Sequence, residues 1–279
     1  MTAVISEFVT LDDENQIHVI HAKPSAGKQT FVFLNSMGAT TQVWEERIAP
    51  ALREQGFGTL AFDYRGQGLT SYGPEATLEP DEIVSDIVHV MKDQDPQRPV
   101  MCCLSIGGLF GVRAFEKGMQ AEAMVLVNTL RKANAQVEWI NTLEARLIAM
   151  GGMPLVLDVL RPVLSSVQQL EHFRPTHLLE EGYTSWPEDH PRRRLADGVN
   201  KANWDFSWET LTVPTLVFTG LHDRLFRIQK DVDEIIARIP DPTVIEYEEG
   251  GHSLHAEFPE QFVADLINFA TVLDDNSIL

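Results

Sequence analysis

Short apolar runs alternate along the chain with segments whose apolar positions have helical spacing. Six runs have the length and composition of buried strands: residues 30–34, 58–62, 99–104, 123–127, 215–219 and 243–247. Helical spacing predicts helices between or after them, at residues 41–53, 80–91, 106–117 and 258–272. Residues 7–11 and 17–22 predict an opening hairpin with its turn at 12–15. This alternation predicts an α/β fold, a mostly parallel central sheet with helices on both faces.

One long segment departs from this alternation. Between about residues 130 and 208 no run has a strand pattern, and residues 136–149 and 153–164 have helical spacing. An insertion between two core strands would lie over the carboxyl ends of the sheet, where ligands bind in open α/β sheets. We therefore predict a core of residues 1–129 and 209–279 and a helical cap of residues 130–208. A second helical lobe without a catalytic role is the alternative.

The composition indicates an acidic protein with one sizeable core. The chain has 279 residues, of which 44% are hydrophobic, and a formal net charge of −19. Such a surface repels phosphate backbones and anionic lipid heads, so we expect neither nucleic acid nor a membrane as partner. We find no apolar run near the roughly 18–20 residues of a membrane span and no signal peptide. A local group of arginines could still bind an anionic substrate.

The two cysteines are adjacent, at Cys102 and Cys103, in a predicted strand. Neighbouring strand residues point to opposite faces, so we expect neither a disulfide between them nor a metal site. This cysteine usage favours a reduced, cytoplasmic protein. The sequence leaves open whether the protein is a homo-oligomer.

A candidate nucleophile lies at a junction between a predicted strand and a predicted helix. The sequence there is Cys103-Leu104-Ser105-Ile106-Gly107-Gly108. In the G-x-S-x-G nucleophile elbow, small residues on both sides of the serine allow a tight turn that exposes its hydroxyl. Cys103 replaces the first glycine, and it is small enough for the turn. The alternative is a structural serine that caps the helix.

The serine needs a base and an acid that orients the base. His252 follows Gly250 and Gly251 shortly after the last predicted strand, and Asp223 follows the strand before it. His255 is a rival base, but its place beside the start of the final helix favours packing or capping. The order Ser105, Asp223, His252 is that of α/β-hydrolases, and each residue follows a predicted strand. We therefore predict a catalytic triad at one edge of the sheet.

The reaction also needs hydrogen-bond donors for a developing oxyanion. We predict that these are the backbone N–H groups of Ile106, at the start of the helix, and Met37, in the loop after the 30–34 strand. No cofactor and no metal are required. Arg131, Arg146 and Arg161 could bind a substrate carboxylate, or could be solvated helix charges.

The chain resembles the α/β-hydrolase superfamily over essentially its whole length. Residues 34–38, Leu-Asn-Ser-Met-Gly, together with Trp44, resemble the 3-oxoadipate enol-lactonase and carboxylesterase branch. Residues 104–108, the D-x-R-G-x-G loop at 63–68 and the pair Gly251-His252 fit that branch as well. Related esterases, haloperoxidase-like enzymes and C–C bond hydrolases share most of these motifs.

The predicted function is therefore hydrolysis of a small carboxylic ester or lactone through an acyl-enzyme on Ser105. C–C bond hydrolysis or a perhydrolase activity by the same triad is the first alternative. The second is a small-molecule binding protein of the same fold that performs no reaction. Dehalogenase chemistry is disfavoured, because that route needs an aspartate at the position of Ser105.

Overall fold

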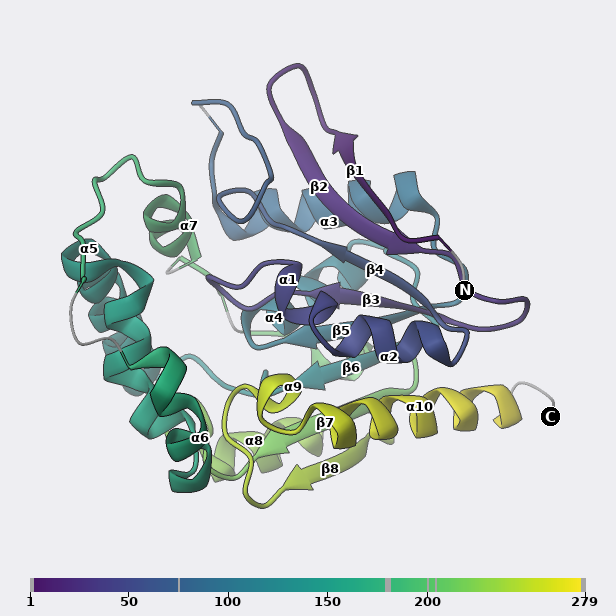
Figure 1. The fold of residues 1–279 in the computed structure, drawn as a ribbon. Coiled ribbons are helices and arrows are strands. Elements are labelled where there is room, and N and C mark those ends of the chain that lie inside the picture. The colour runs from purple at the N-terminus through teal and green to yellow at the C-terminus, as the bar shows by residue number, and fades with distance from the viewer. Residues whose placement is uncertain (1–2, 75, 179–181, 200, 204, 277–279) are drawn as a thin grey trace.

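The computed structural model describes residues 3–74, 76–178, 182–199, 201–203 and 205–276, in which it forms one eight-stranded sheet (Figure 1). The strands are β1 Ile5–Thr10, β2 Gln16–Ala22, β3 Thr30–Leu34, β4 Gly58–Phe62, β5 Pro99–Leu104, β6 Ala123–Val127, β7 Thr215–Gly220 and β8 Thr243–Tyr247. Their spatial order is β1-β2-β4-β3-β5-β6-β7-β8, antiparallel at β1 and β2 and parallel from β4 to β8. The predicted α/β class with a mostly parallel sheet is confirmed.

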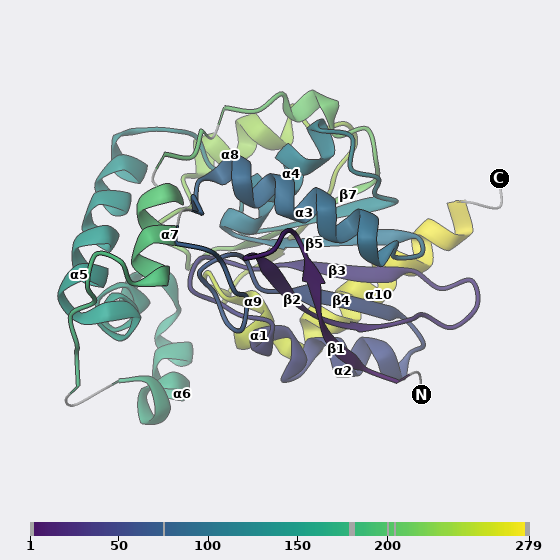
Figure 2. The same cartoon turned by 90° about the horizontal axis from the view of Figure 1, so that it is seen from above.

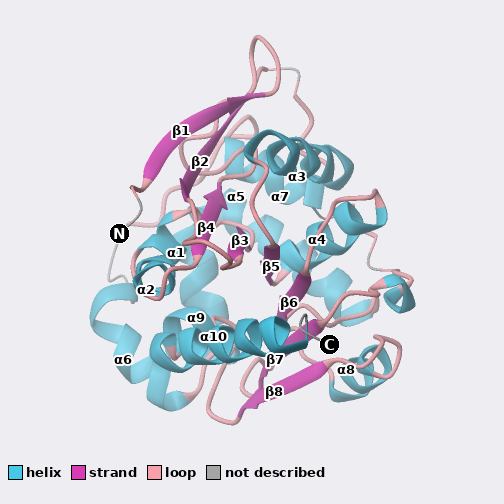
Figure 3. Cartoon of the chain, turned by 90° about the vertical axis from the view of Figure 1, so that its right-hand side faces the viewer, coloured by secondary structure: helices cyan, strands magenta, loops and turns pink. Residues whose placement is uncertain are grey.

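Helices cover both faces of the sheet, as Figure 2 shows from above. One face carries α3 Pro80–Gln94, α4 Ile106–Glu116 and α8 Gln229–Ile236. The other carries α1 Gln42–Glu45, α2 Ile48–Glu54, α9 Leu254–Glu257 and α10 Pro259–Asn276. Figure 3 shows the same two layers on either side of the strands in a view turned by 90° about the vertical axis.

Successive side chains of each central strand point to opposite faces of the sheet, so each strand contributes residues to two separate hydrophobic cores. In β5, Met101 and Cys103 join the core under α3 and α4, whereas Val100 and Cys102 join the core under α2 and α10. Both cysteines are buried free thiols, as the strand pattern predicted. The central strands are buried on both faces, which explains why their sequences are continuous apolar runs.

The chain between β6 and β7 is helical where the structure describes it. It contains α5 Ala135–Leu164, α6 Val167–His177, α7 Pro191–Val199 and the short 3-10 helix η1 Trp208–Thr210. Figure 1 shows α5, α6 and α7 together at one end of the sheet. Gly152 interrupts α5 with φ 68° and ψ −170°, between the two helices that the sequence pattern predicted there.

The length and composition of α5 correct one expectation from the sequence. Within the described residues, Ala135–Leu164 is long and apolar enough to cross a membrane by those two measures, with a mean hydropathy of 1.6 over its most apolar window. In the sequence the two halves of α5 have separate helical spacing on either side of Gly152, so no single apolar run of this length stands out. Only 28% of that window is buried inside the protein, so much of its apolar surface is exposed.

Other differences concern short or polar helices. The helix predicted over residues 41–53 is two helices, α1 and α2, because Arg47 between them has a non-helical backbone at φ −142° and ψ −44°. The sequence pattern did not predict α6, α7, α8 or α9. Proline inside α6 and the consecutive arginines of α7 obscure their apolar spacing, and α9 has four residues.

The buried His255 in α9 gives stability a pH dependence. Its ring packs against Trp44 and Phe262, at centroid distances of 5.0 and 6.5 Å. Among the described residues its Nδ1 has no hydrogen-bond partner. Burial, together with the charge of nearby His252, lowers the pKa of His255 to about 4 from its ordinary value of 6.5.

We predict that this histidine lowers the free energy of unfolding as pH falls from about 6.5 to about 4. In that window the unfolded chain binds a proton that the folded site resists, and the loss reaches about 3 kcal/mol. Denaturation of the wild type and of His255→Asn across this pH range measures it. The pH-dependent difference between the two proteins should vanish above pH 7, and equal slopes below it would contradict the prediction.

Candidate functional site

Ser105 occupies a strained turn between β5 and α4. Its backbone has φ 53° and ψ −117°, a conformation that residues with a side chain rarely adopt. Two hydrogen bonds hold it there: the Ser105 N–H donates to the Val127 carbonyl at 2.8 Å, and the Thr129 hydroxyl donates to the Ser105 carbonyl at 2.6 Å. Strain of this kind persists only where the surroundings fix it, and it is concentrated at functional sites.

The glycines around Ser105 allow strand and helix to approach closely. A Cβ on Gly107 would lie 2.5 Å from the Leu34 carbonyl oxygen of β3. Cys103, which stands where the usual motif has its first glycine, faces Gly111 of α4, where an added Cβ would lie 2.7 Å from the Cys103 sulfur. A glycine one helical turn further along therefore makes room for the larger residue.

Asp223 and His252 form a buried, hydrogen-bonded pair. The distance from Asp223 Oδ2 to His252 Nδ1 is 2.6 Å. The other carboxylate oxygen accepts the N–H of Phe226 at 3.0 Å. Burial alone would raise the pKa of Asp223, but the charge and hydrogen bond of His252, the Phe226 N–H and the charge of Arg131 lower it below its ordinary value. Asp223 is therefore ionised at neutral pH and orients the ring through Nδ1.

Asn128, just after β6, ties the loops that carry this pair. Its side-chain amide donates to the carbonyls of Gly251 and His252 at 2.9 and 2.8 Å, and its Oδ1 accepts the N–H of Gly220 at 2.9 Å. The sequence analysis did not identify Asn128 as a residue of the site. The structure shows its contribution, because one buried amide fixes the end of β7 to the histidine loop.

Four of the five predicted site residues line one cavity of about 140 Å³ between the core and the helical segment after β6. Its lining includes Ser105, His252, Met37 and Ile106. Asp223 lies behind His252, through the bond between their side chains. Ile106 is the first residue of α4, so its N–H is one of the four that have no acceptor within the helix.

The loop that carries Met37 is fixed by side chains from its neighbours. The Asn35 amide donates to the Phe62 carbonyl at 2.9 Å, and the Trp44 indole N–H donates to Asn35 Oδ1 at 2.7 Å. The Gln67 amide donates to the Ser36 carbonyl at 3.1 Å. Three of the motifs noted in the sequence, at 34–38, Trp44 and 63–68, thus serve to position one loop of the cavity.

Arg131 is the residue of this site whose place the sequence did not define. It is 5% exposed and lines the cavity, and its Nη2 donates to Ser105 Oγ at 3.0 Å and to the Asn128 carbonyl at 3.1 Å. Within the described residues, the Ser105 hydroxyl oxygen accepts this hydrogen bond from Arg131 and forms no hydrogen bond with His252. The candidate nucleophile is therefore hydrogen-bonded to an arginine in this structure.

Two ionisable groups of the cavity wall influence each other. Burial lowers the pKa of Arg131 to about 10, against the charges of Asp223 and Glu144, which raise it. Burial raises the pKa of Glu144, from α5, to about 7, against the charge of Arg131, which lowers it. At neutral pH the guanidinium is charged while the Glu144 carboxyl is only partly ionised.

The other two arginines considered as carboxylate ligands lie elsewhere. Arg146 is exposed on α5. Arg161 packs its guanidinium 4.8 Å from the Phe173 ring centroid and lines a different groove, with residues of α6. Only Arg131 of the three lines the cavity of Ser105. Local sequence did not distinguish them, since all three are arginines in or beside predicted helices.

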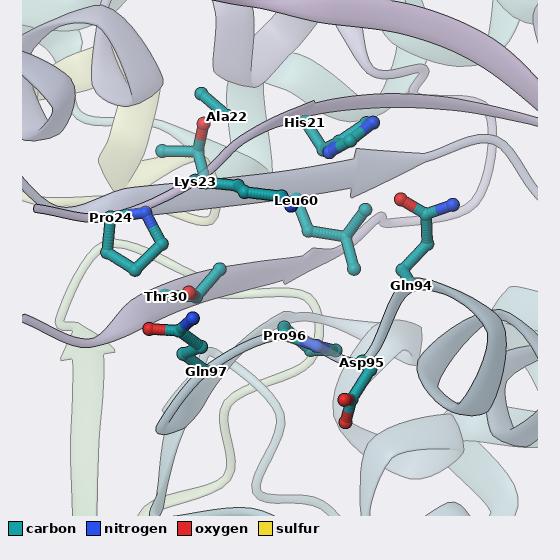
Figure 4. A pocket seen from close by; sticks show the side chains of 11 residues that line it. His21, Ala22, Lys23, Pro24, Thr30, Leu60, Gln94, Asp95, Pro96 and Gln97 are labelled. Atoms are coloured by element: carbon teal, nitrogen blue, oxygen red, sulfur yellow. The ribbon is translucent and has the colours of Figure 1, made fainter. Parts of the chain in front are cut away.

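A larger cavity of about 260 Å³ lies at the opposite edge of the sheet (Figure 4). Thr30, the first residue of β3, lines it, whereas Ser36, just after the last residue of β3, lines the cavity of Ser105. Figure 4 shows the side chains of Lys23, Gln94 and Gln97 around it. It therefore belongs to the amino ends of the parallel strands. Among the described residues, no group of three or more His, Cys, Asp and Glu side chains is placed to hold a metal ion.

Comparison with known proteins agrees with this architecture. The chain is 22% identical over 205 residues to "Putative carbamate hydrolase RutD" of Variovorax paradoxus, covering 72% of this chain and 76% of that protein. It is 21% identical over 248 residues to 3-oxoadipate enol-lactonase 2 of Acinetobacter baylyi, covering 85% and 86%. The solved esterase EaEST from Exiguobacterium antarcticum superimposes with a TM-score of 0.76 at 16% identity, covering 96% of this chain and 100% of that one.

The family model described as "Alpha/beta hydrolase family" matches residues 31–266, which include the Ser105 turn, Asp223 and His252. The matched span runs from β3 to the interior of α10. The resemblance drawn from the sequence motifs is therefore confirmed, and the chain belongs to the alpha/beta hydrolase family.

Proposed function

We propose that this protein is a serine hydrolase that cleaves a carboxylic ester or lactone of a small molecule through an acyl-enzyme. The observation that carries the proposal is the strained Ser105 turn in the same cavity as a histidine bonded at 2.6 Å to a buried, ionised aspartate. A histidine bound through Nδ1 to a carboxylate has Nε2 free to accept a proton. A buried carboxylate in that place stabilises the cation that then forms.

In the proposed reaction, Ser105 Oγ attacks the carbonyl carbon while His252 Nε2 takes the hydroxyl proton. The N–H groups of Met37 and Ile106 stabilise the oxyanion, and Asp223 stabilises the imidazolium. The tetrahedral intermediate expels the alcohol, which takes the proton from His252, and leaves an acyl group on Ser105. Water then attacks the acyl carbon while His252 Nε2 takes its proton. The second tetrahedral intermediate expels Ser105 Oγ, which takes that proton back from His252, and the acid is released. Every proton moves between this chain, the substrate and water, so the reaction needs no cofactor.

The size of the cavity favours a small substrate. A volume of about 140 Å³ holds few non-hydrogen atoms. Apolar side chains of α5 form part of its wall, namely Met153, Val156, Leu157, Leu160 and Leu164. The similar proteins named above are an esterase, a lactonase and a carbamate hydrolase, three activities that cleave a bond at a carbonyl carbon. Acyl transfer to water is their common chemistry, and it is the chemistry that the Ser105 cavity supports best.

Ser105→Ala should abolish hydrolysis of short p-nitrophenyl esters and leave the fold intact. Loss of the nucleophile of such a triad lowers kcat on the order of 10⁶-fold. Initial rates and the far-UV circular dichroism spectrum measure both effects. A fluorophosphonate should label the wild type on Ser105 under native conditions and leave Ser105→Ala unlabelled. An unlabelled wild type would favour a binding protein, and a variant that keeps most of its activity would exclude Ser105 as nucleophile.

Asp223→Asn should lower kcat by about 10⁴-fold, because an amide stabilises the wrong imidazole tautomer and does not stabilise the cation. The measurement is the rate of ester hydrolysis across neutral pH. Asp241→Asn, in the exposed turn before β8, is the matched control and should retain wild-type rates. If the Asp223 variant matched the wild type at every pH, another acid would have to orient His252.

Asn128→Ala should lower both activity and stability. It removes the acceptor of the Gly220 N–H and the donor to two loop carbonyls, at about 1–3 kcal/mol for each buried group left unpaired. Displacement of the histidine loop by about 1 Å costs about 10²-fold in rate.

Asn15→Ala is the control for this variant, because Asn15 is equally buried but lies in the turn between β1 and β2, remote from the cavity. It should lose stability and keep its kcat. Urea denaturation and ester hydrolysis of both variants provide the measurements. If Asn128→Ala kept a wild-type kcat, Asn128 would have no part in positioning His252.

A further inference from the structure

Glu257, the last residue of α9, is a buried carboxylate that the reaction described above does not use. It is 7% exposed. Its Oε2 accepts the N–H of Gly251 at 2.5 Å, and its Oε1 accepts the hydrogen bond of the Ser165 hydroxyl at 3.0 Å. Gly251 immediately precedes His252, and Ser165 immediately follows the last residue of α5. One carboxylate therefore joins the histidine loop to the end of α5.

The histidine loop and the end of α5 are in close contact at this point. The N–H of His252 donates to the Leu164 carbonyl at 2.7 Å. Gly251 has no room for a Cβ against the same carbonyl, and an added Cβ would lie 2.7 Å from the Cα of Ser165. Leu164 also lines the cavity of Ser105. The segment that forms part of the cavity wall therefore holds the candidate base through its backbone.

The burial of the Glu257 carboxylate makes its two hydrogen bonds important to the local structure. Burial raises the pKa of Glu257 above its ordinary value of 4.5, while hydrogen bonds from Gly251, Ser165 and the Ser253 backbone, and the charge of His252, act in the opposite direction. A buried carboxylate that lost these donors would be costly. The folded protein therefore favours the arrangement in which Gly251 and Ser165 are both bound to it.

We propose that Glu257 is a positioning residue for His252, because its carboxylate fixes Gly251 against the end of α5 and so sets the place of the imidazole. This inference rests on the proposed hydrolase function and adds a residue to its machinery. Asn128 binds the carbonyls of Gly251 and His252, whereas Glu257 binds the Gly251 N–H, so the two residues hold different groups of one loop. Glu257 also makes the position of the base depend on the end of α5.

The test compares two substitutions of Glu257 in the hydrolysis of a short p-nitrophenyl ester. In Glu257→Gln the amide can still accept the Gly251 N–H through its oxygen and donate to the Ser165 hydroxyl through its nitrogen, so most of kcat should remain. Glu257→Leu removes both contacts and should lower kcat by about 10²-fold, the effect of displacing a reacting group by about 1 Å. KM should stay close to the wild-type value in both variants, because Glu257 does not line the Ser105 cavity.

Two further variants separate positioning from a general loss of stability. Glu122→Leu is the matched control: Glu122 accepts from Arg98 at 2.6 Å just before β6, at the amino end of the strand, so its loss should lower stability and leave kcat unchanged. Ser165→Ala removes one donor to Glu257 and should lower kcat by less than Glu257→Leu. The double variant of Ser165→Ala and Glu257→Leu should be no slower than Glu257→Leu alone, because both changes act through one contact.

A measurement on His252 itself needs no substrate. The proton between His252 Nδ1 and Asp223 Oδ2, in a hydrogen bond of 2.6 Å, should give a proton NMR resonance at low field. Glu257→Leu should shift or broaden this resonance, whereas Glu257→Gln and Glu122→Leu should keep it at the wild-type position. If Glu257→Leu fails to fold, Ser165→Ala provides the test, through a lower kcat at unchanged KM.

The outcomes distinguish this inference from the proposed function. If Glu257→Leu, or Ser165→Ala in its place, keeps the wild-type kcat and the wild-type resonance, or if the two changes lower kcat additively, Glu257 serves only the stability of the fold and the inference is wrong. Wild-type activity that depends on Ser105 would still support the hydrolase in that case. A wild type that cleaves no ester would overturn the proposed function, while the resonance would still show whether Glu257 positions His252.

Discussion

The backbone conformation of Ser105 is the constraint on which the rest of the site depends. A positive φ at a residue with a Cβ is unfavourable, and here it is held by the Val127 carbonyl, the Thr129 hydroxyl and the start of α4. The parallel pairing of β5 with β3 and β6 brings those partners to the same edge of the sheet. Glycines at 107 and 111 then let the helix lie against the strands. The hydroxyl is consequently presented to the cavity by a rigid junction rather than by a mobile loop.

A buried side-chain amide, that of Asn128, helps to position the loops that carry the other two residues. Asn128 joins the end of β7 to the loop after β8, so the loops that carry Asp223 and His252 have one common anchor. The anchor follows β6, the strand next to the one that presents Ser105. The end of α5 holds the same two loops, because the Leu164 carbonyl accepts the His252 N–H at 2.7 Å and the Val163 carbonyl accepts the Arg224 N–H at 2.9 Å. The relative positions of the three side chains therefore depend on the sheet, on the Asn128 amide and on the end of α5.

The buried Arg131 places a positive charge inside a protein whose net charge is strongly negative. A net charge of −19 repels anions at a distance, yet a guanidinium inside the cavity dominates the local field because little water screens it. The acidic surface thus bears on solubility, whereas Arg131 and Glu144 set the charge at the wall of the Ser105 cavity. Substrate preference in such a site is a property of a few ångströms around Ser105.

The sequence by itself determined the α/β class, the positions of the central strands, and the chain order of serine, acid and base. These depend on local periodicity and on residues that directly follow strands, which a linear pattern preserves. Only the tertiary structure decided that Arg131, rather than Arg146 or Arg161, lies at the cavity, and that Asn128 anchors the histidine loop. The two helix breaks differ in this respect. The break at Gly152 coincides with a gap in the helical spacing of the sequence, whereas the break at Arg47 has no such sign. The physical reason is that a side chain's partners across the fold depend on the path of the chain between elements. An arginine in the loop before α5 and two arginines within α5 give no local sign of which one lies at the cavity.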